Sequence, residues 1–301
     1  MSARRLKALL DSAAAALGIG LLDVLEHTDR KRAANFGAAL LRYGGPLTKE
    51  HRIGRDNLRA AFPEKSDAEI EQILTGVWDN LGRVGAEFAH LDDFHIEGIG
   101  PPAPDGITYE PETVERHHRL LKSERPAIAF AAHLANWEVP ALCAKLMGLN
   151  SAVLYRRPNL KTVSDLIVKR RTPLMGQLIA TGFDAPVRLA RLLQSGVHVG
   201  LLADQHYTKG VEVTFFGRRC LANPLVALLA RQTECPIYGT RVVRLADGNS
   251  FWGELTDEIA PTRDAEGRID VKRTTQTITS VIEGWVREHP EQWLWVHRRW
   301  R

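Results

Sequence analysis

The chain has 301 residues, and 44% of them are apolar, which is enough for a sizeable core and one large domain. Its 40 Lys and Arg against 36 Asp and Glu leave a formal net charge of +4, which suits an anionic partner such as a phosphate or a membrane surface and gives no reason to expect nucleic acid. The three cysteines lack CxxC spacing, which argues against a disulfide framework and favours a reducing compartment.

An apolar stretch near the N-terminus, residues 8–25, is too short to span a membrane. Asp11 and Asp23 leave eleven uncharged residues between them, whereas a spanning helix needs roughly 18. Apolar residues recur there at helical spacing behind three basic residues, so we expect residues 1–25 to form an amphipathic helix in a membrane interface. A helix packed on the protein's own core and a signal peptide are the alternatives.

Residues 26–96 are predicted to form a helical N-terminal region. Ser66 and Glu69 have the spacing of a capping box, and apolar residues follow at helical spacing from Ile70 to Val84. A stretch rich in Pro and Gly, residues 97–111, is typical of a linker and separates this region from the rest of the chain.

Residues 97–301 are predicted to form an α/β core. Short apolar runs alternate there with helical patterns. The predicted strands are 126–132, 151–156, 197–203 and 236–243, and the predicted helices are 113–124, 140–148, 186–196 and 222–233. This alternation predicts an α/β fold with a mixed, largely parallel central sheet flanked by helices. His117 and His118 lie in a polar part of the first helix and are expected to be exposed.

The stretch "FAAHLANWEVP", residues 130–140, places a histidine where a predicted strand ends. Asn136 is a favoured helix N-cap, and Pro140 then falls in the first turn of the helix. His133 on the turn and Glu138 in the opening turn of the helix can then point at one site, with the imidazole as a general base and the carboxylate as its partner. A structural histidine beside a glutamate at a helix N-terminus is the alternative.

Other polar residues follow the predicted strands, and active groups collect at the carboxyl ends of parallel strands. Arg156 follows the second strand, and Asp204 and Gln205 follow the third. We expect Asp204 to pair with an arginine and Gln205 to shape a substrate site. A solvated basic surface and an ordinary turn aspartate are the alternatives.

The segment "HLANWE", residues 133–138, resembles the H-x-x-N-W-E signature of the lipid A late acyltransferases, which belong to the glycerolipid acyltransferase superfamily and its H-x₄-D/E motif. Four further segments resemble blocks of that family in the same order: 57–73, 155–159, 204–217 and 290–299. One departure is visible, because the family often has Gly where this chain has Ala132 and Ala135.

The resemblance implies acyl transfer from an acyl thioester, with acyl carrier protein as the donor, to a hydroxyl of a lipid A precursor. It implies His133 and Glu138 as the catalytic pair and no cofactor or metal. It also implies that Arg171 supports the site, with Arg170 close behind. The expected substrate-binding residues are Arg171, Arg170, Arg156, Asp204, Gln205 and Asn136. The expected place is the cytoplasmic face of the bacterial inner membrane, peripheral or interfacial, with residues 97–301 as the acyltransferase core of one catalytic domain.

Three rival interpretations remain open at this point. The acceptor could be another lipid, such as a lysophospholipid or an aminolipid, with the same chemistry. A metal-dependent hydrolase could use His133, Glu138, Asp204 and His206, although no H-E-x-x-H spacing supports it. A non-catalytic lipid-binding protein is the third.

Trp293 and Trp295 near the C-terminus alternate as in a terminal strand, with a membrane-interface segment as the alternative.

Overall fold

The structure is a computed structural model that describes residues 16, 18–99, 106–158 and 160–300. Most of the helix expected over residues 1–25 lies outside the described residues, and residues 18–26 are helical. Within the described ranges, no helix combines the length and the apolar character needed to cross a bilayer.

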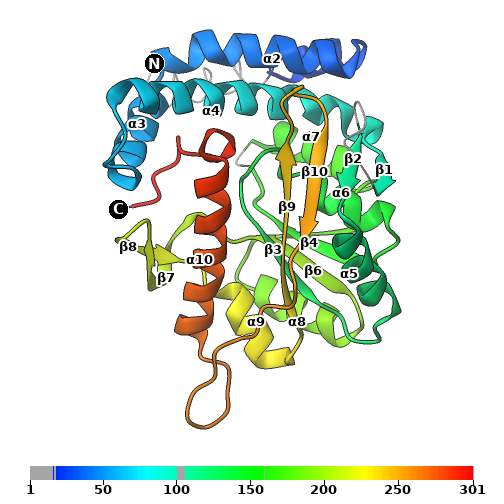
Figure 1. Cartoon of the computed structure of the whole chain (residues 1–301). Coiled ribbons are helices and arrows are strands. Elements are labelled where there is room, and N and C mark those ends of the chain that lie inside the picture. Colours follow the sequence, from blue (N-terminus) through cyan, green and yellow to red (C-terminus); the bar gives the residue numbers. More distant parts are fainter. Residues whose placement is uncertain (1–15, 17, 100–105, 159, 301) are drawn as a thin grey trace, which may run out of the picture.

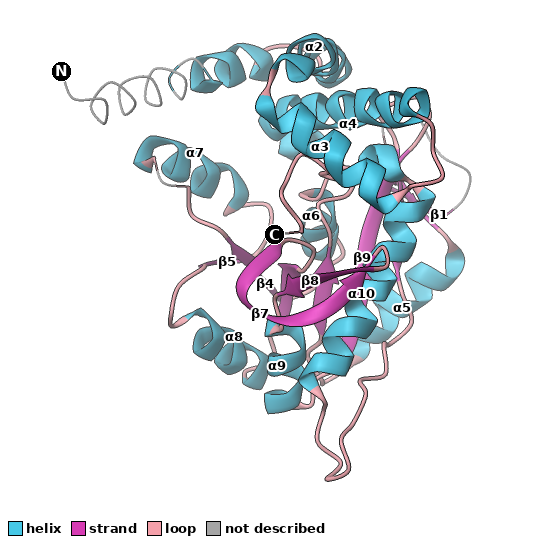
Figure 2. Cartoon of the chain, turned by 90° about the vertical axis from the view of Figure 1, so that its left-hand side faces the viewer, coloured by secondary structure: helices cyan, strands magenta, loops and turns pink. Residues whose placement is uncertain are grey.

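The N-terminal region consists of helices, as predicted. Its helices are α2 (Arg30–Gly44), α3 (Lys49–Ala61) and α4 (Asp67–Glu87). The predicted capping box starts α4: the Ser66 hydroxyl accepts a bond from the Glu69 N–H at 3.3 Å, and the Glu69 carboxylate accepts one from the Ser66 N–H at 2.8 Å. Helices α2 and α4 pack side by side across the end of the sheet toward which β9 points, as Figures 1 and 2 show.

A mostly parallel sheet forms the centre of the molecule, which confirms the predicted α/β class. Over the described residues its strand order is β1-β2-β10-β9-β3-β6-β4-β5, and the only antiparallel neighbours are β9 and β10. Its strands are β1 (Ile96–Ile99), β2 (Ile107–Tyr109), β3 (Ile128–Ala131), β4 (Ser151–Tyr155), β5 (Gln177–Ala180), β6 (His198–Leu202), β9 (Ile237–Arg244) and β10 (Phe251–Leu255).

Two strands correct the prediction of a linker over residues 97–111. Strand β1 begins just before that stretch and β2 lies inside it, and both join the main sheet at its edge beside β10. They were missed because each is only three or four residues long and lies among Pro and Gly. The four predicted strands correspond to β3, β4, β6 and β9.

Helices cover both faces of the sheet. They are α5 (Pro111–Lys122), α6 (Val139–Leu146), α7 (Lys161–Arg171), α8 (Ala185–Gln194), α9 (Leu225–Thr233) and α10 (Val271–Glu288). Because side chains alternate along a strand, Ile128 and Phe130 of β3 enter one core with Leu229 of α9 and Ile282 of α10. On the other face, α6 packs over the sheet through Val139 and Leu142.

The C-terminal segment corrects the prediction of a terminal strand. Trp293 forms one isolated bridge with Leu134, and Trp293 and Trp295 are both buried, with their ring centroids 4.7 Å apart. Both rings lie in one aromatic cluster, and no strand forms because the pairing of this segment is limited to that single bridge. Phe215 and Phe216, at the tight turn between β7 (His206–Phe215) and β8 (Arg218–Ala222), belong to this cluster.

Close contact between α2 and α4 depends on two glycines. A Cβ on Gly82 would lie 2.1 Å from the carbonyl oxygen of Gly37, and one on Gly37 would lie 2.3 Å from that of Gly82. Gly85, one turn along α4, has nothing within 4 Å of its Cβ position.

We therefore expect Gly82→Ala to reduce the free energy of unfolding by about 1–3 kcal/mol, because the added methyl group forces the helices apart. Gly85→Ala should instead increase the free energy of unfolding by about 0.5–1 kcal/mol, because it restricts the unfolded chain at an open helical position. Denaturant unfolding of both variants tests this. Equal effects of the two substitutions would contradict the packing argument.

Candidate functional site

The histidine of the "HLANWE" segment lies on the turn between β3 and α6, as predicted, but the helix starts later than expected. Strand β3 ends at Ala131, and α6 begins at Val139, so Glu138 rather than Asn136 is the residue before the first helical turn. The Asn136 side chain instead accepts a bond from the Glu138 N–H at 3.1 Å and stabilises the turn itself.

The partner of His133 is Asp204, which follows β6. The His133 Nδ1 lies 2.8 Å from one Asp204 carboxylate oxygen, and the His133 backbone N–H donates to the other at 2.9 Å. The Trp293 indole N–H donates to that second oxygen at 2.8 Å. An ionised carboxylate can only accept a hydrogen bond, so Nδ1 carries the proton and the lone pair of the neutral ring is on Nε2. The Gln205 amide nitrogen lies 3.3 Å from Nε2.

The charge of Asp204 is stabilised although only 3% of the residue is exposed. Burial by itself raises the pKa of this carboxyl group, but the His133 ring and the hydrogen bonds from His133 and Trp293 outweigh burial and lower the pKa to about 2. Asp204 is therefore an anion at neutral pH and holds the His133 ring in one orientation.

Glu138 has a different partner from the one predicted. Its carboxylate accepts a bond from the Arg171 guanidinium at 2.5 Å, with both side chains largely buried. The sequence interpretation paired His133 with Glu138 and Asp204 with an arginine. The structure exchanges the two: the histidine contacts the aspartate, and the arginine contacts the glutamate.

A buried polar network stabilises the turn between β3 and α6, and the sequence did not predict it. Glu87, at the end of α4, is 0% exposed, accepts a bond from the Asn136 amide at 2.9 Å and forms a two-pronged ion pair with Arg244 of β9. The helical spacing could have predicted a buried carboxylate here, because Glu87 follows Val84 by three residues and so lies on the apolar face of α4.

Ala135 is the residue in this turn with an unusual backbone. Its φ is 47°, in the left-handed region that favours glycine. Its N–H donates to the Gln292 carbonyl at 2.9 Å, and its carbonyl accepts from the Asn80 amide at 3.0 Å. These contacts hold an alanine in a conformation that costs roughly 1–2 kcal/mol.

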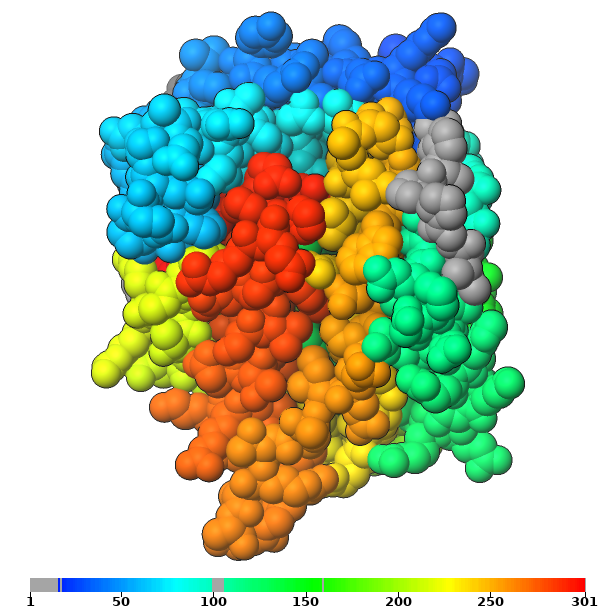
Figure 3. Space-filling view, viewed as in Figure 1, coloured from blue at the N-terminus to red at the C-terminus, as the bar shows by residue number. Residues whose placement is uncertain are grey.

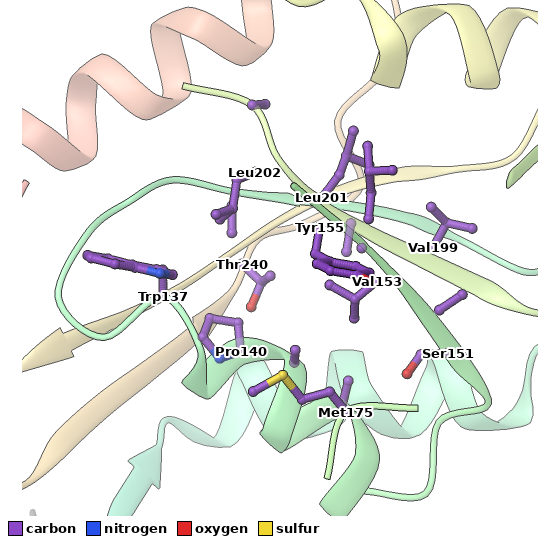
Figure 4. Close-up of a pocket in the computed structure, with 18 of the residues that line it drawn as sticks. Trp137, Pro140, Ser151, Val153, Tyr155, Met175, Val199, Leu201, Leu202 and Thr240 are labelled. Atoms are coloured by element: carbon purple, nitrogen blue, oxygen red, sulfur yellow. The ribbon is translucent and has the colours of Figure 1, made fainter. Parts of the chain in front are cut away.

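A cavity of about 620 Å³ lies between the sheet and α6 and extends from His133 across the sheet. We call it the sheet cavity. On the sheet side it is lined by small residues, namely Ala129 and Ala131 of β3 and Gly200 of β6. A Cβ added to Gly200 would have its nearest neighbour 4.0 Å away. Figure 4 shows the mostly apolar side chains that line it between Trp137 and Ser151.

The predicted site residues divide into two groups. His133, Glu138, Arg171, Arg156 and Gln205 line the sheet cavity, and Asp204 lies directly behind His133. Two others do not line it in the described structure. Asn136 is 0% exposed and bonded to Glu87, and Arg170 contacts Glu26 and the carbonyl oxygen of Ala89.

The residues of the rival metal site do not converge. The carboxylate of Glu138 is paired with Arg171, and that of Asp204 with His133. Over the described ranges, no group of three or more His, Cys, Asp or Glu side chains has an arrangement that could hold a metal ion.

The family model of the bacterial lipid A biosynthesis acyltransferases matches residues 3–301, which is almost the whole chain. The chain belongs to this family. It is an acyltransferase of lipid A biosynthesis, and the resemblance seen in "HLANWE" and the later segments is confirmed.

Two curated relatives of this lipid A acyltransferase are similar over most of its length. They are the lipid A biosynthesis palmitoleoyltransferase of Escherichia coli (strain K12) and a lipid A biosynthesis acyltransferase of Shigella flexneri. Each is 23% identical over 261 residues, which cover 85% of this chain and 80% of the relative.

The hydrogen-bonded carboxylate of Asp204 leads to a prediction for pH and stability. Because the pKa is about 2 in the folded acyltransferase and near 3.9 in an unfolded chain, the stabilisation is complete above about pH 4 and is lost as the pH falls toward 2. We expect Asp204→Asn to be less stable at pH 6 and to lose less stability than the wild type on acidification. Urea unfolding between these pH values tests this, and the same acid dependence in both proteins would refute it.

Proposed function

We propose that the protein transfers a fatty acyl chain from an acyl thioester, carried by acyl carrier protein, to a hydroxyl group of a lipid A precursor. The single observation that carries this proposal is the His133–Asp204 pair at the end of a long apolar cavity. The family supplies the pathway, and the geometry suggests which residues do the chemistry.

In the proposed reaction His133 is the general base. Its Nε2 removes the proton of the acceptor hydroxyl as the oxygen attacks the thioester carbonyl, which gives a tetrahedral intermediate. Collapse of the intermediate breaks the carbon–sulfur bond, and the imidazolium returns the proton to the leaving thiolate. The products are an ester and a free thiol. Asp204 stabilises the imidazolium, and no acyl-enzyme is needed.

Arg171 and Glu138 would handle the negative charge of the substrates. The Arg171 guanidinium lines the cavity beside His133, and its buried Nε has no hydrogen-bond partner among the described residues. Glu138 fixes the orientation of that guanidinium. A planar arginine with donors still available can bind a phosphate oxygen or the oxyanion of the intermediate. Arg156, which is exposed and lines the cavity, would bind a second anionic group.

The sheet cavity would hold the acyl chain. The acyl chain is apolar, and the cavity is lined mainly by aliphatic side chains along β3, β4 and β6. Its volume falls in the usual range for ligand sites of 300–1,000 Å³. The small residues Ala129, Ala131 and Gly200 leave room for a chain to lie along the sheet with its carbonyl at His133.

An apolar stripe on α2 supports attachment to the cytoplasmic face of the inner membrane. Phe36, Leu40 and Tyr43 are 51%, 48% and 82% exposed and recur at helical spacing, and Leu47 follows at 88%. Helix α2 forms the outer edge of the molecule in Figure 3. A stripe of this kind can enter a membrane interface together with the amphipathic segment that precedes it.

The proposed chemistry is tested by His133→Ala and Glu138→Ala in a purified transfer assay with an acylated carrier protein and a lipid A precursor. Loss of the base should reduce kcat by about 10²–10⁴, and Glu138→Ala should lose most activity because Arg171 is no longer held. His118→Ala, an exposed histidine, is the control and should retain full activity. Wild-type turnover by folded His133→Ala would refute the mechanism.

Membrane attachment is tested by sedimentation with vesicles that contain anionic phospholipid. Leu40→Asp should reduce binding several-fold, because a charge in the stripe opposes insertion. Leu228→Asp is the matched control, since Leu228 of α9 is 47% exposed against 48% for Leu40. Binding should also weaken with salt. Equal losses for the two variants would argue against α2 as the membrane face.

A further inference from the structure

One end of the sheet cavity is formed by α5. His117 and Leu120 of α5 line it there together with Tyr238 of β9 and Leu255 of β10. Leu120, Leu255 and Tyr238 also pack with Ala127 and Leu149 in one small apolar cluster. We call this part of the cavity the α5 end. Besides His117 and Tyr238, the polar lining residues here are Thr240, which pairs with Leu255 in the sheet, and His198, whose Nδ1 accepts a bond from the Ala127 N–H.

His117 is buried, contrary to the expectation from the sequence that it is exposed, and its environment is unusual. It is only 7% exposed, and its Nδ1 is buried without a hydrogen-bond partner in the described structure. Its ring packs against Tyr109 in a T-shaped arrangement, with the centroids 5.7 Å apart. Buried polar groups are nearly always hydrogen-bonded, so an unpartnered imidazole that lines a ligand cavity indicates a partner supplied by the ligand.

The partner of His117 must be uncharged. Burial lowers the pKa of His117 to about 4, so the ring is neutral at physiological pH and has one N–H donor and one lone pair. Among the described residues that line the cavity, the charged side chains are Glu138, Arg156 and Arg171, which belong to the His133 end. A hydroxyl group can both accept from and donate to a neutral imidazole, whereas a carboxylate would meet no cation at the α5 end.

The strand register gives the distance of this end from the reacting atoms. Tyr238 pairs with Ala129, which precedes His133 by four residues on β3. At about 3.3 Å per residue the α5 end lies roughly 13 Å along the sheet from His133, and further across it. A group that reaches His117 is therefore on the distal part of a chain whose carbonyl is at His133.

We propose that His117 is a binding residue for a hydroxyl group on the distal half of the acyl chain, so that the sheet cavity selects distally hydroxylated chains over unsubstituted ones. This inference rests on the proposed function, because it takes the sheet cavity as the acyl site. It names the chemical class of the chain through a contact with no part in the reaction itself.

Binding of matched fatty acids to the full-length protein tests the proposal without any turnover. Three saturated fatty acids of equal length displace a fluorescent fatty acid: one unsubstituted, one hydroxylated on the second carbon and one hydroxylated in the distal half. We expect the wild type to bind the distally hydroxylated acid roughly 3- to 10-fold more tightly than the unsubstituted acid, as one net hydrogen bond allows. The acid hydroxylated on the second carbon should gain nothing.

His117→Phe keeps a ring of similar shape and removes both nitrogens, so the preference should disappear or reverse while the unsubstituted acid still binds. His118→Phe makes the same change at the exposed neighbour and should leave the preference intact. His117→Gln restores a donor and an acceptor and should recover part of the preference, which separates recognition from a general loss of folding.

Three results would overturn the inference: equal affinity of the wild type for all three acids, a preference that survives in His117→Phe, or an equal preference for the acid hydroxylated on the second carbon. If the wild type bound none of the acids, both this inference and the assignment of the cavity to the acyl chain would be wrong. Intact hydroxyl preference without any acyl transfer would refute the proposed function alone.

Discussion

The buried carboxylate of Asp204 is the group on which the rest of the site depends. It accepts three hydrogen bonds, two from His133 and one from Trp293, and so joins the end of β6, the turn after β3 and the C-terminal segment. A carboxylate that is 3% exposed remains charged only because these donors replace its lost water. The orientation of the imidazole, the burial of the tryptophan and the lowered pKa are consequences of one local electrostatic requirement.

The second constraint is the Glu87–Arg244 ion pair, which is equally buried. It joins the last turn of α4 to β9, and through Asn136 it reaches the turn that carries Glu138. The N-terminal helices therefore contribute to the site, because the Glu87 side chain at the end of α4 holds the segment between His133 and α6. Truncation of one buried charge of such a pair leaves the other uncompensated, which typically costs 3–5 kcal/mol.

The sheet cavity exists because several side chains on one face of the central strands are small. The alternate residues of β3 are Ala129 and Ala131 on the cavity side and Ile128 and Phe130 on the other. The large residues fill the core under α9 and α10, and the small ones leave a space under α6. One strand thus supplies side chains to the core on one face and lines the cavity on the other, and the buried His117 side chain at the α5 end adds a polar group to the cavity lining.

The sequence alone determined the alternation of strands and helices, the capping box at Ser66, the place of His133 at a strand end and the family of the chain, because each is encoded in local spacing or in a motif. It missed the strands β1, β2, β5, β7, β8 and β10, the pairing of the charged side chains at the site, the buried network at Glu87 and the burial of His117. Those depend on which segments the fold brings together: Asp204 is 71 residues from His133 in the chain, and Arg171 is 33 from Glu138. Only the tertiary structure decided which carboxylate meets which base, because the desolvation and hydrogen bonding that select partners occur between segments that local patterns cannot relate.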